Sequence, residues 1–249
     1  MKQSMAGLIA GAVGLLLLLV LVGHIPTTGF EGVDDTIIVH RMPLWEKVAR
    51  FHLRHVEFER WAREAAGGET DPQRRVLKLM DWTVKTVQHI PTGWPFIDDH
   101  ISHIVLRHYG NDGQLAEVFT ALTTYTGNQG RWEAYQPQGA RERVALSFVE
   151  SEDGWWVFDL WNGGWFETPS GRIATIDDFR HPEQLRRRGL APEMLNGTPY
   201  LDYFKELDQV WKRSFSRARG QMPWHRLLMV LSLEPDDDDW VPQRRLHRP

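Results

Sequence analysis

The acidic and imidazole side chains that could do chemistry gather in the middle of the chain. Asp112 lies at the start of the segment Gly110–Gly127, GNDGQLAEVFTALTTYTG, where a carboxylate either caps a helix or takes part in a reaction. Asp159 ends the aromatic segment GWWVFD. Carboxylates and imidazoles together can act as acid and base groups or as ligands of a divalent metal. Three histidines precede Asp112 closely: His100, His103 and His108.

These histidines lack the spacing of an established metal motif. Asp99 stands beside them as a fourth ligand candidate, and imidazoles three residues apart can share one helix face. The chain has no HExxH pattern, so we expect no metal and no cofactor. The histidines are interpreted as surface or groove-lining side chains. Their closeness to Asp112 still makes this segment the best place for a divergent active site.

Asp112 also has a purely structural interpretation. Either Asn111 or Asp112 can cap the helix that follows, and Asn111 with Gln114 has the spacing of a capping box. Such a cap contributes about 1 kcal/mol to stability. We therefore predict a helix cap at this position rather than a catalyst.

The elements that must position these residues are helices followed by strands. Apolar residues recur at three- and four-residue spacing from Pro43 to about Ala66, and Asp71 with Pro72 starts a second helix. The helix of Gly110–Gly127 comes next. Short antiparallel strands are predicted after it, over residues 131–135, 143–151, 155–161 and 165–168. Helices first and a strand meander afterwards indicate an α+β domain.

Composition narrows the classes of function. The chain has 249 residues, is 42% hydrophobic and carries a net charge of -4, which disfavours a nucleic-acid partner. It has no cysteine, which excludes disulfides, thiolate metal sites and a cysteine nucleophile.

The amino terminus is strongly apolar. The run Met5–Gly23, MAGLIAGAVGLLLLLVLVG, predicts a transmembrane anchor over residues 1–24, with a cleaved signal peptide as the alternative. Lys2 on one flank places the rest of the chain outside the cytoplasm, as a single-pass protein of the inner membrane with a periplasmic domain. We expect a linker over residues 25–43, a globular domain over 44–233 and a polar tail over 234–249.

The order of the predicted elements resembles the transglutaminase-like superfamily, which has a papain-like fold. Five features carry the resemblance over roughly residues 72–179: a helix start near Asp112, a helix stop at Gly127, a strand entry at Arg131, a strand over Val144–Val149 and the segment Gly154–Asp159. The resemblance implies a core of helices packed on an antiparallel sheet.

The resemblance also implies a catalytic triad, of which this chain keeps one member. The family's cysteine at the start of the core helix falls on Asp112, its histidine on Val144 or Ala145, and its aspartate on Asp159. A carboxylate at a helix amino terminus is stabilised by the helix dipole and is therefore a poor nucleophile. The family's acyl transfer through a thioester is predicted to be absent.

Three functions remain open at this point. The first is a membrane-anchored binding or accessory module in cell-envelope or exopolysaccharide assembly, because an aromatic-rich sheet suits carbohydrate or peptide ligands. The second is a divergent hydrolase or metal-dependent enzyme that uses Asp112, Asp159 and a nearby histidine. The third is a scaffold whose apolar segment Trp224–Leu233 docks a membrane partner. The expected partners are the membrane and a membrane protein or polysaccharide.

Overall fold

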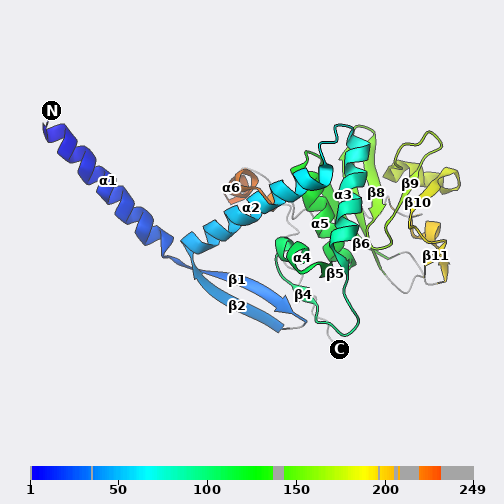
Figure 1. Cartoon of the computed structure of the whole chain (residues 1–249), viewed down its shortest axis with the longest axis horizontal. Coiled ribbons are helices and arrows are strands. Elements are labelled where there is room, and N and C mark those ends of the chain that lie inside the picture. Colours follow the sequence, from blue (N-terminus) through cyan, green and yellow to red (C-terminus); the bar gives the residue numbers. More distant parts are fainter. Residues whose placement is uncertain are drawn as a thin grey trace.

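The computed structural model describes residues 2–34, 36–136, 143–195, 197–204, 207 and 219–230. Within these residues the chain is an α+β protein built of helices and antiparallel sheets, with one short parallel pair of strands. Figure 1 shows one helix and a hairpin projecting from a body of helices and strands. The predicted polar tail, residues 234–249, lies outside the described residues.

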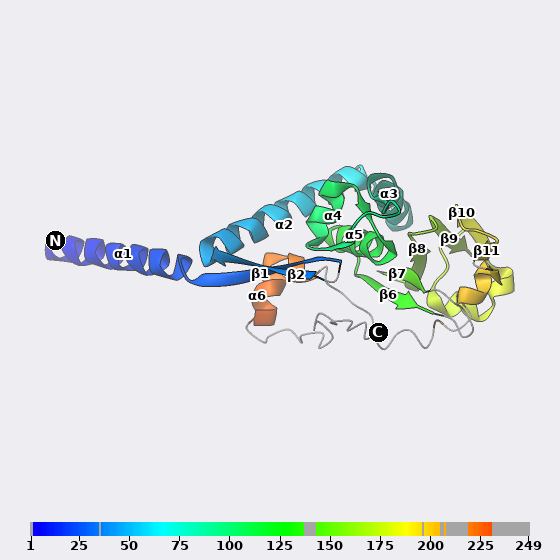
Figure 2. The ribbon, with the colours of Figure 1, turned by 90° about the horizontal axis from the view of Figure 1, so that it is seen from below.

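Helix α1 (Lys2–Gly23) is formed by the apolar amino-terminal sequence and projects from the body of the chain (Figures 1 and 2). The prediction of a transmembrane helix over residues 1–24 is wrong. In the part of the chain that the structure describes, no helix has the length and apolar character needed to cross a membrane.

Residues 25–43, expected as a linker, contain a β-hairpin. Strand β1 (Pro26–Val33) pairs antiparallel with β2 (Thr36–Pro43) along its whole length. Asp34 supplies the positive φ of 51° that the turn requires. The end of β1 also pairs with β4 (Ile97–Asp98), which gives a three-stranded sheet in the order β2-β1-β4. β2 is therefore an edge strand.

Four helices make up the helical layer; three of them begin at the predicted sequence signals, and α4 was not predicted. Their bounds are α2 (Leu44–Ala66), α3 (Pro72–Thr86), α4 (Ile101–Arg107) and α5 (Asp112–Tyr125). Asp71 caps α3 by accepting a hydrogen bond from the Arg74 N–H at 2.8 Å. α5 is buried on most sides because α2, α3 and the sheet all pack against it.

A five-stranded antiparallel sheet follows, in the order β10-β9-β8-β7-β6. Its strands are β6 (Gly130–Tyr135), β7 (Val144–Ser151), β8 (Gly154–Asp159), β9 (Gly164–Glu167) and β10 (Arg186–Gly189). One apolar core joins the sheet to the helices and includes Phe119 and Phe158. A second core includes Phe148 and Tyr200. Figure 2 shows the helices on one side of these strands and the short segments that follow β9 on the other.

Short elements complete the description. They are β3 (Gln88–His89), β5 (Tyr109–Gly110), β11 (Met194–Leu195), β12 (Thr198–Pro199), the 3-10 helices η1 (Ile176–Arg180), η2 (Pro182–Gln184), η3 (Tyr200–Phe204) and η5 (Arg219–Gln221), and helix α6 (Pro223–Val230). α6 packs against α2, and its Trp224 stays exposed. The parallel β3–β5 pair places His89 beside Gly110, directly before α5.

Candidate functional site

The amino end of α5 is built by a capping box, as predicted. The Asn111 side chain accepts a hydrogen bond from the Gln114 N–H at 2.9 Å, and the Gln114 side chain accepts one from the Asn111 N–H at 3.1 Å. Asp112 is the first residue of the helix and accepts a bond from the Gly113 N–H at 2.8 Å. Its half-buried carboxylate therefore lies where the free N–H groups of the first turn favour negative charge.

Asp159 ends β8 in the interior, with only 1% of its surface exposed. Its carboxylate accepts hydrogen bonds from the Tyr200 hydroxyl at 2.6 Å, from the Asn162 side chain at 2.6 Å and from the Asn162 N–H at 3.1 Å. Burial raises the pKa of Asp159 and the charge of Asp112 adds to the rise, whereas the bonds from Tyr200 and Asn162 oppose it. The two predicted carboxylates thus interact electrostatically, but Asp159 is shielded from solvent.

The third triad-equivalent position supplies no functional group. Ala145 lies in β7 opposite Ala134 of β6 and is 1% exposed. Its neighbour Leu146 lies directly opposite Asp159. The three positions singled out in the sequence, Asp112, Ala145 and Asp159, thus lie on α5, β7 and β8, and the Ala145 methyl group supplies no acid or base.

His100 caps α4, and its ring bonds to Ser102 and Gln221. Its Nδ1 accepts a hydrogen bond from the Ser102 N–H at 3.2 Å, so in the neutral ring Nε2 carries the proton and donates to Gln221 Oε1 at 2.6 Å. Burial lowers the pKa of His100 to about 3, and the charge of Arg54 contributes in the same direction. His100 is therefore neutral near pH 7 and its two nitrogens are engaged.

The other two predicted histidines also make structural contacts. His103 Nδ1 lies 3.0 Å from Asp99 Oδ2, and Arg107 binds the other oxygen of Asp99 at 2.5 Å. His108 takes the left-handed C-cap position of α4, with φ of 62°, and its ring lies 3.2 Å from the Thr86 carbonyl oxygen. Among the described residues, no group of three or more histidine and acidic side chains is placed to hold a metal ion.

A fourth histidine, not singled out in the sequence, lies beside Gly110, which directly precedes Asn111 and α5. His89 pairs with Gly110 in the β3–β5 bridge, and its ring stacks on Trp161 with centroids 3.5 Å apart and planes 7° apart. Its Nε2 donates to the Trp161 carbonyl at 3.0 Å. Because Trp161 follows Asp159 by two residues, this stack joins β8 to the start of α5. A bridge of two residues per strand leaves no periodicity that could have revealed it.

Further aromatic rings surround this end of the helix. Trp94 is 55% exposed and meets Tyr109 of β5 edge to face at 5.1 Å. Trp132 of β6 covers the first turn of α5 so closely that a Cβ on Gly113 would come within 3.1 Å of its ring. We call His89, Trp94, Tyr109 and Trp161 the aromatic pairs. They form one stacked pair, His89 with Trp161, and one edge-to-face pair, Trp94 with Tyr109, beside the β3–β5 bridge.

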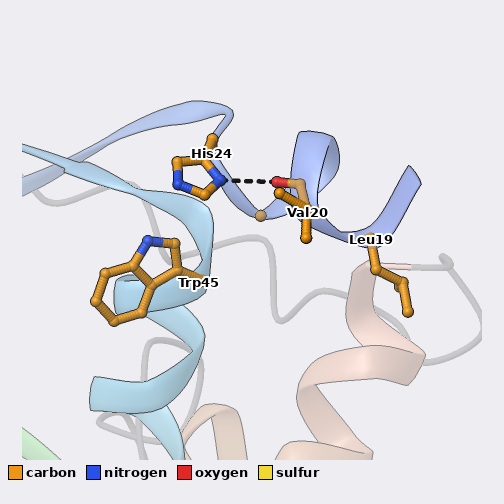
Figure 3. A pocket seen from close by; sticks show the side chains of 5 residues that line it. Leu19, Val20, His24 and Trp45 are labelled. Atoms are coloured by element: carbon orange, nitrogen blue, oxygen red, sulfur yellow. Dashed lines mark hydrogen bonds between the residues drawn. The ribbon is translucent and has the colours of Figure 1, made fainter. Parts of the chain in front are cut away.

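A shallow apolar pocket of about 490 Å³ lies elsewhere, at the junction of α1 and α2 (Figure 3). It is lined by Leu19, Val20, Gly23, His24 and Trp45. The His24 ring donates a hydrogen bond through Nδ1 to the Val20 carbonyl oxygen at 2.8 Å. The pocket holds no carboxylate and is separate from the candidate site.

Comparison with known proteins gives one distant likeness. No family model matches the chain, and no curated protein matches it. The crystal structure of a "putative cysteine protease" from Cytophaga hutchinsonii is distantly similar, with a TM-score of 0.37 and 15% identity over 54% of this chain and 47% of that chain. The chain thus spans about half the length of that protein. This chain contains no cysteine, so it has no thiol nucleophile.

Proposed function

We propose that the chain is a non-catalytic binding module with a degenerate transglutaminase-like core, acting as an accessory protein in cell-envelope or exopolysaccharide assembly. The residues at the former triad positions serve the fold. Asp159 accepts three hydrogen bonds in the interior, and Ala145 has no polar group. Without a thiol and an imidazole at these positions, a thioester intermediate cannot form.

The observation that carries this proposal is the set of aromatic pairs beside the amino end of α5. His89 and Trp94 are exposed, and Trp161 and Tyr109 are half-buried behind them. Aromatic rings offer a flat apolar face at low entropic cost. Such faces suit the C–H surface of a sugar ring, while imidazole and indole groups bond its hydroxyls. We therefore propose a saccharide as the ligand.

Calorimetric titration of the full chain with cellohexaose and with soluble peptidoglycan fragments tests this proposal. The Trp94→Ala variant should lose about five- to thirtyfold in affinity, because an exposed stacking ring contributes about 1–2 kcal/mol to binding. Trp224→Ala is the matched control, since Trp224 is 66% exposed on α6, which packs against α2 and η5. Equal affinities of the two variants, or no binding of either probe, would contradict the proposal.

A hydrolase is the second candidate, favoured by the raised pKa of Asp159 beside the charge of Asp112. A carboxyl group of raised pKa next to an ionised one is a common acid–base arrangement. In this candidate Asp112 and His89 contact the substrate, because Asp159 is buried. Release of reducing ends from the same probes, lost in Asp112→Asn, would favour hydrolysis. Binding without release, unchanged in Asp112→Asn, favours the binding module.

A further inference from the structure

β2 is an exposed edge strand: among the described residues, β1 pairs with one of its sides and no strand pairs with the other. The first six of its eight residues are exposed, and β1 pairs with its other side along the whole strand. Alternate residues of an edge strand direct their N–H and C=O groups away from the sheet. Within the described residues no other strand pairs with β2. The backbone of another strand can form hydrogen bonds with these N–H and C=O groups.

The exposed side chains of β2 are mostly apolar. Ile37, Ile38 and Val39 are 55%, 41% and 53% exposed, and Phe30, opposite Val39 in β1, is 70% exposed. Edge strands are usually protected by lysine, proline or a bulge. None of these interrupts β2 between Thr36 and Val39, and its proline is the last residue. The edge thus has the composition of a paired strand.

The hairpin is held in place at its tip. The Asp34 N–H donates to the Phe96 carbonyl at 2.7 Å, and the Phe96 N–H donates to Asp34 Oδ1 at 2.9 Å. These bonds and the β1–β4 pairing fix the tip to the body of the chain.

The base of the hairpin is fixed as well. The Thr27 hydroxyl donates to the Met42 carbonyl at 2.8 Å, and the Lys47 ammonium donates to the Thr28 carbonyl at 2.8 Å. A strand fixed at both ends pairs with little loss of conformational entropy.

We propose that β2 is a dimerisation edge, on which β2 of a second copy of this chain adds as an antiparallel strand. A register centred on Ile38 places Ile37 opposite the partner's Val39, and Ile38 opposite the partner's Ile38. Directly opposed apolar pairs of this kind stabilise a sheet. Both copies use the same patch for this contact, as a two-fold axis requires.

The charges at the two ends of the strand complement each other in this arrangement. In the sequence Asp34 and Asp35 precede β2, whereas His40 and Arg41 lie in its second half. Antiparallel pairing brings the acidic end of one copy to the basic end of the other. Arg41 is exposed and has no ion-pair partner among the described residues, so its charge is available for this contact. This complementarity selects a second copy over an unrelated strand.

Cross-linking of the full chain tests the edge directly, since the chain has no cysteine of its own. Ile38→Cys should give a disulfide-linked dimer under mild oxidation, because opposed residues on paired strands lie within disulfide reach. Glu31→Cys is the matched control. Glu31 lies opposite Ile38 in β1, so its two copies would be three strand spacings apart, about 14 Å. Cross-linking of both variants alike, or of neither, would overturn the proposal.

A charge exchange tests the register. In I37K/V39K and in I37E/V39E, like charges face each other across the axis, so each variant alone should be monomeric by sedimentation velocity. Mixing the two should restore a dimer. Circular dichroism checks that both variants are folded. A monomeric wild-type chain would contradict the proposal. A dimer that persists in both variants would also contradict it, because association would then use another surface.

Discussion

At the scale of single residues, Asp159 shows how a buried carboxylate that the sequence singled out as a candidate site residue is used by the fold. A triad aspartate orients a histidine with one of its oxygens. Here Tyr200 and Asn162 donate to both oxygens, and Ala145 stands where the imidazole would be. The carboxylate therefore joins β8 to η3 across the second core.

The Tyr200→Phe variant should be destabilised by about 1.5–3 kcal/mol, because a buried hydrogen bond to a charged group is lost. The bond from Tyr200 lowers the pKa of Asp159, so its removal raises that pKa further. The cost should be full where Asp159 is ionised and shrink as falling pH protonates the carboxyl group. Urea unfolding between pH 8 and pH 4 measures it.

Tyr203→Phe is the matched control for this prediction. Tyr203 lies in the same 3-10 helix, is equally buried, and donates to the Leu195 carbonyl at a long 3.4 Å. Its loss should cost less than 1 kcal/mol and show no dependence on Asp159 ionisation. If Tyr200→Phe and Tyr203→Phe lose the same stability at every pH, the Tyr200 hydrogen bond does not stabilise the ionised form of Asp159.

At the scale of elements, the start of α5 carries two separate stabilising features, the Asn111 capping box and the Asp112 carboxylate. Asn111→Ala should cost about 1 kcal/mol, because the capping box is lost. Asp112→Ala should cost less, since the lost interaction with the helix dipole, roughly 0.3–1 kcal/mol, is offset by relief of repulsion with Asp159. Chemical denaturation compares the two. A larger cost for Asp112→Ala would show that the carboxylate has the greater structural role.

Sequence reasoning succeeded where the signal was local. The caps at Asp71 and Asn111 depend on residues three positions away, and both were predicted. His89 could not be predicted, because its place beside α5 depends on a two-residue bridge and on a ring stacked against Trp161, far along the chain. The hairpin over residues 26–43 was predicted as a linker, because β1 contains a proline and two glycines and the apolar residues of β2 are consecutive rather than alternating.

At the scale of the whole molecule, Gln221 ties the described part of the carboxyl-terminal region to the helical layer. Its side chain accepts a bond from His100 at 2.6 Å, and its carbonyl accepts one from the Tyr125 hydroxyl at 3.1 Å. The apolar segment Trp224–Leu233 was recognised in the sequence, but the docking point was not, because that point consists of polar bonds to one glutamine.

This contact predicts a loss of stability in mild acid. Burial holds the pKa of His100 at about 3, against about 6.5 in the unfolded chain. The unfolded chain therefore binds a proton first, and stability falls as pH drops below about 6.5, by about 2 kcal/mol at pH 5. His100→Asn keeps a capping oxygen but cannot titrate, so its stability should vary less between pH 7 and pH 5. Parallel profiles for the wild-type protein and His100→Asn in urea unfolding would show that His100 is not the group responsible.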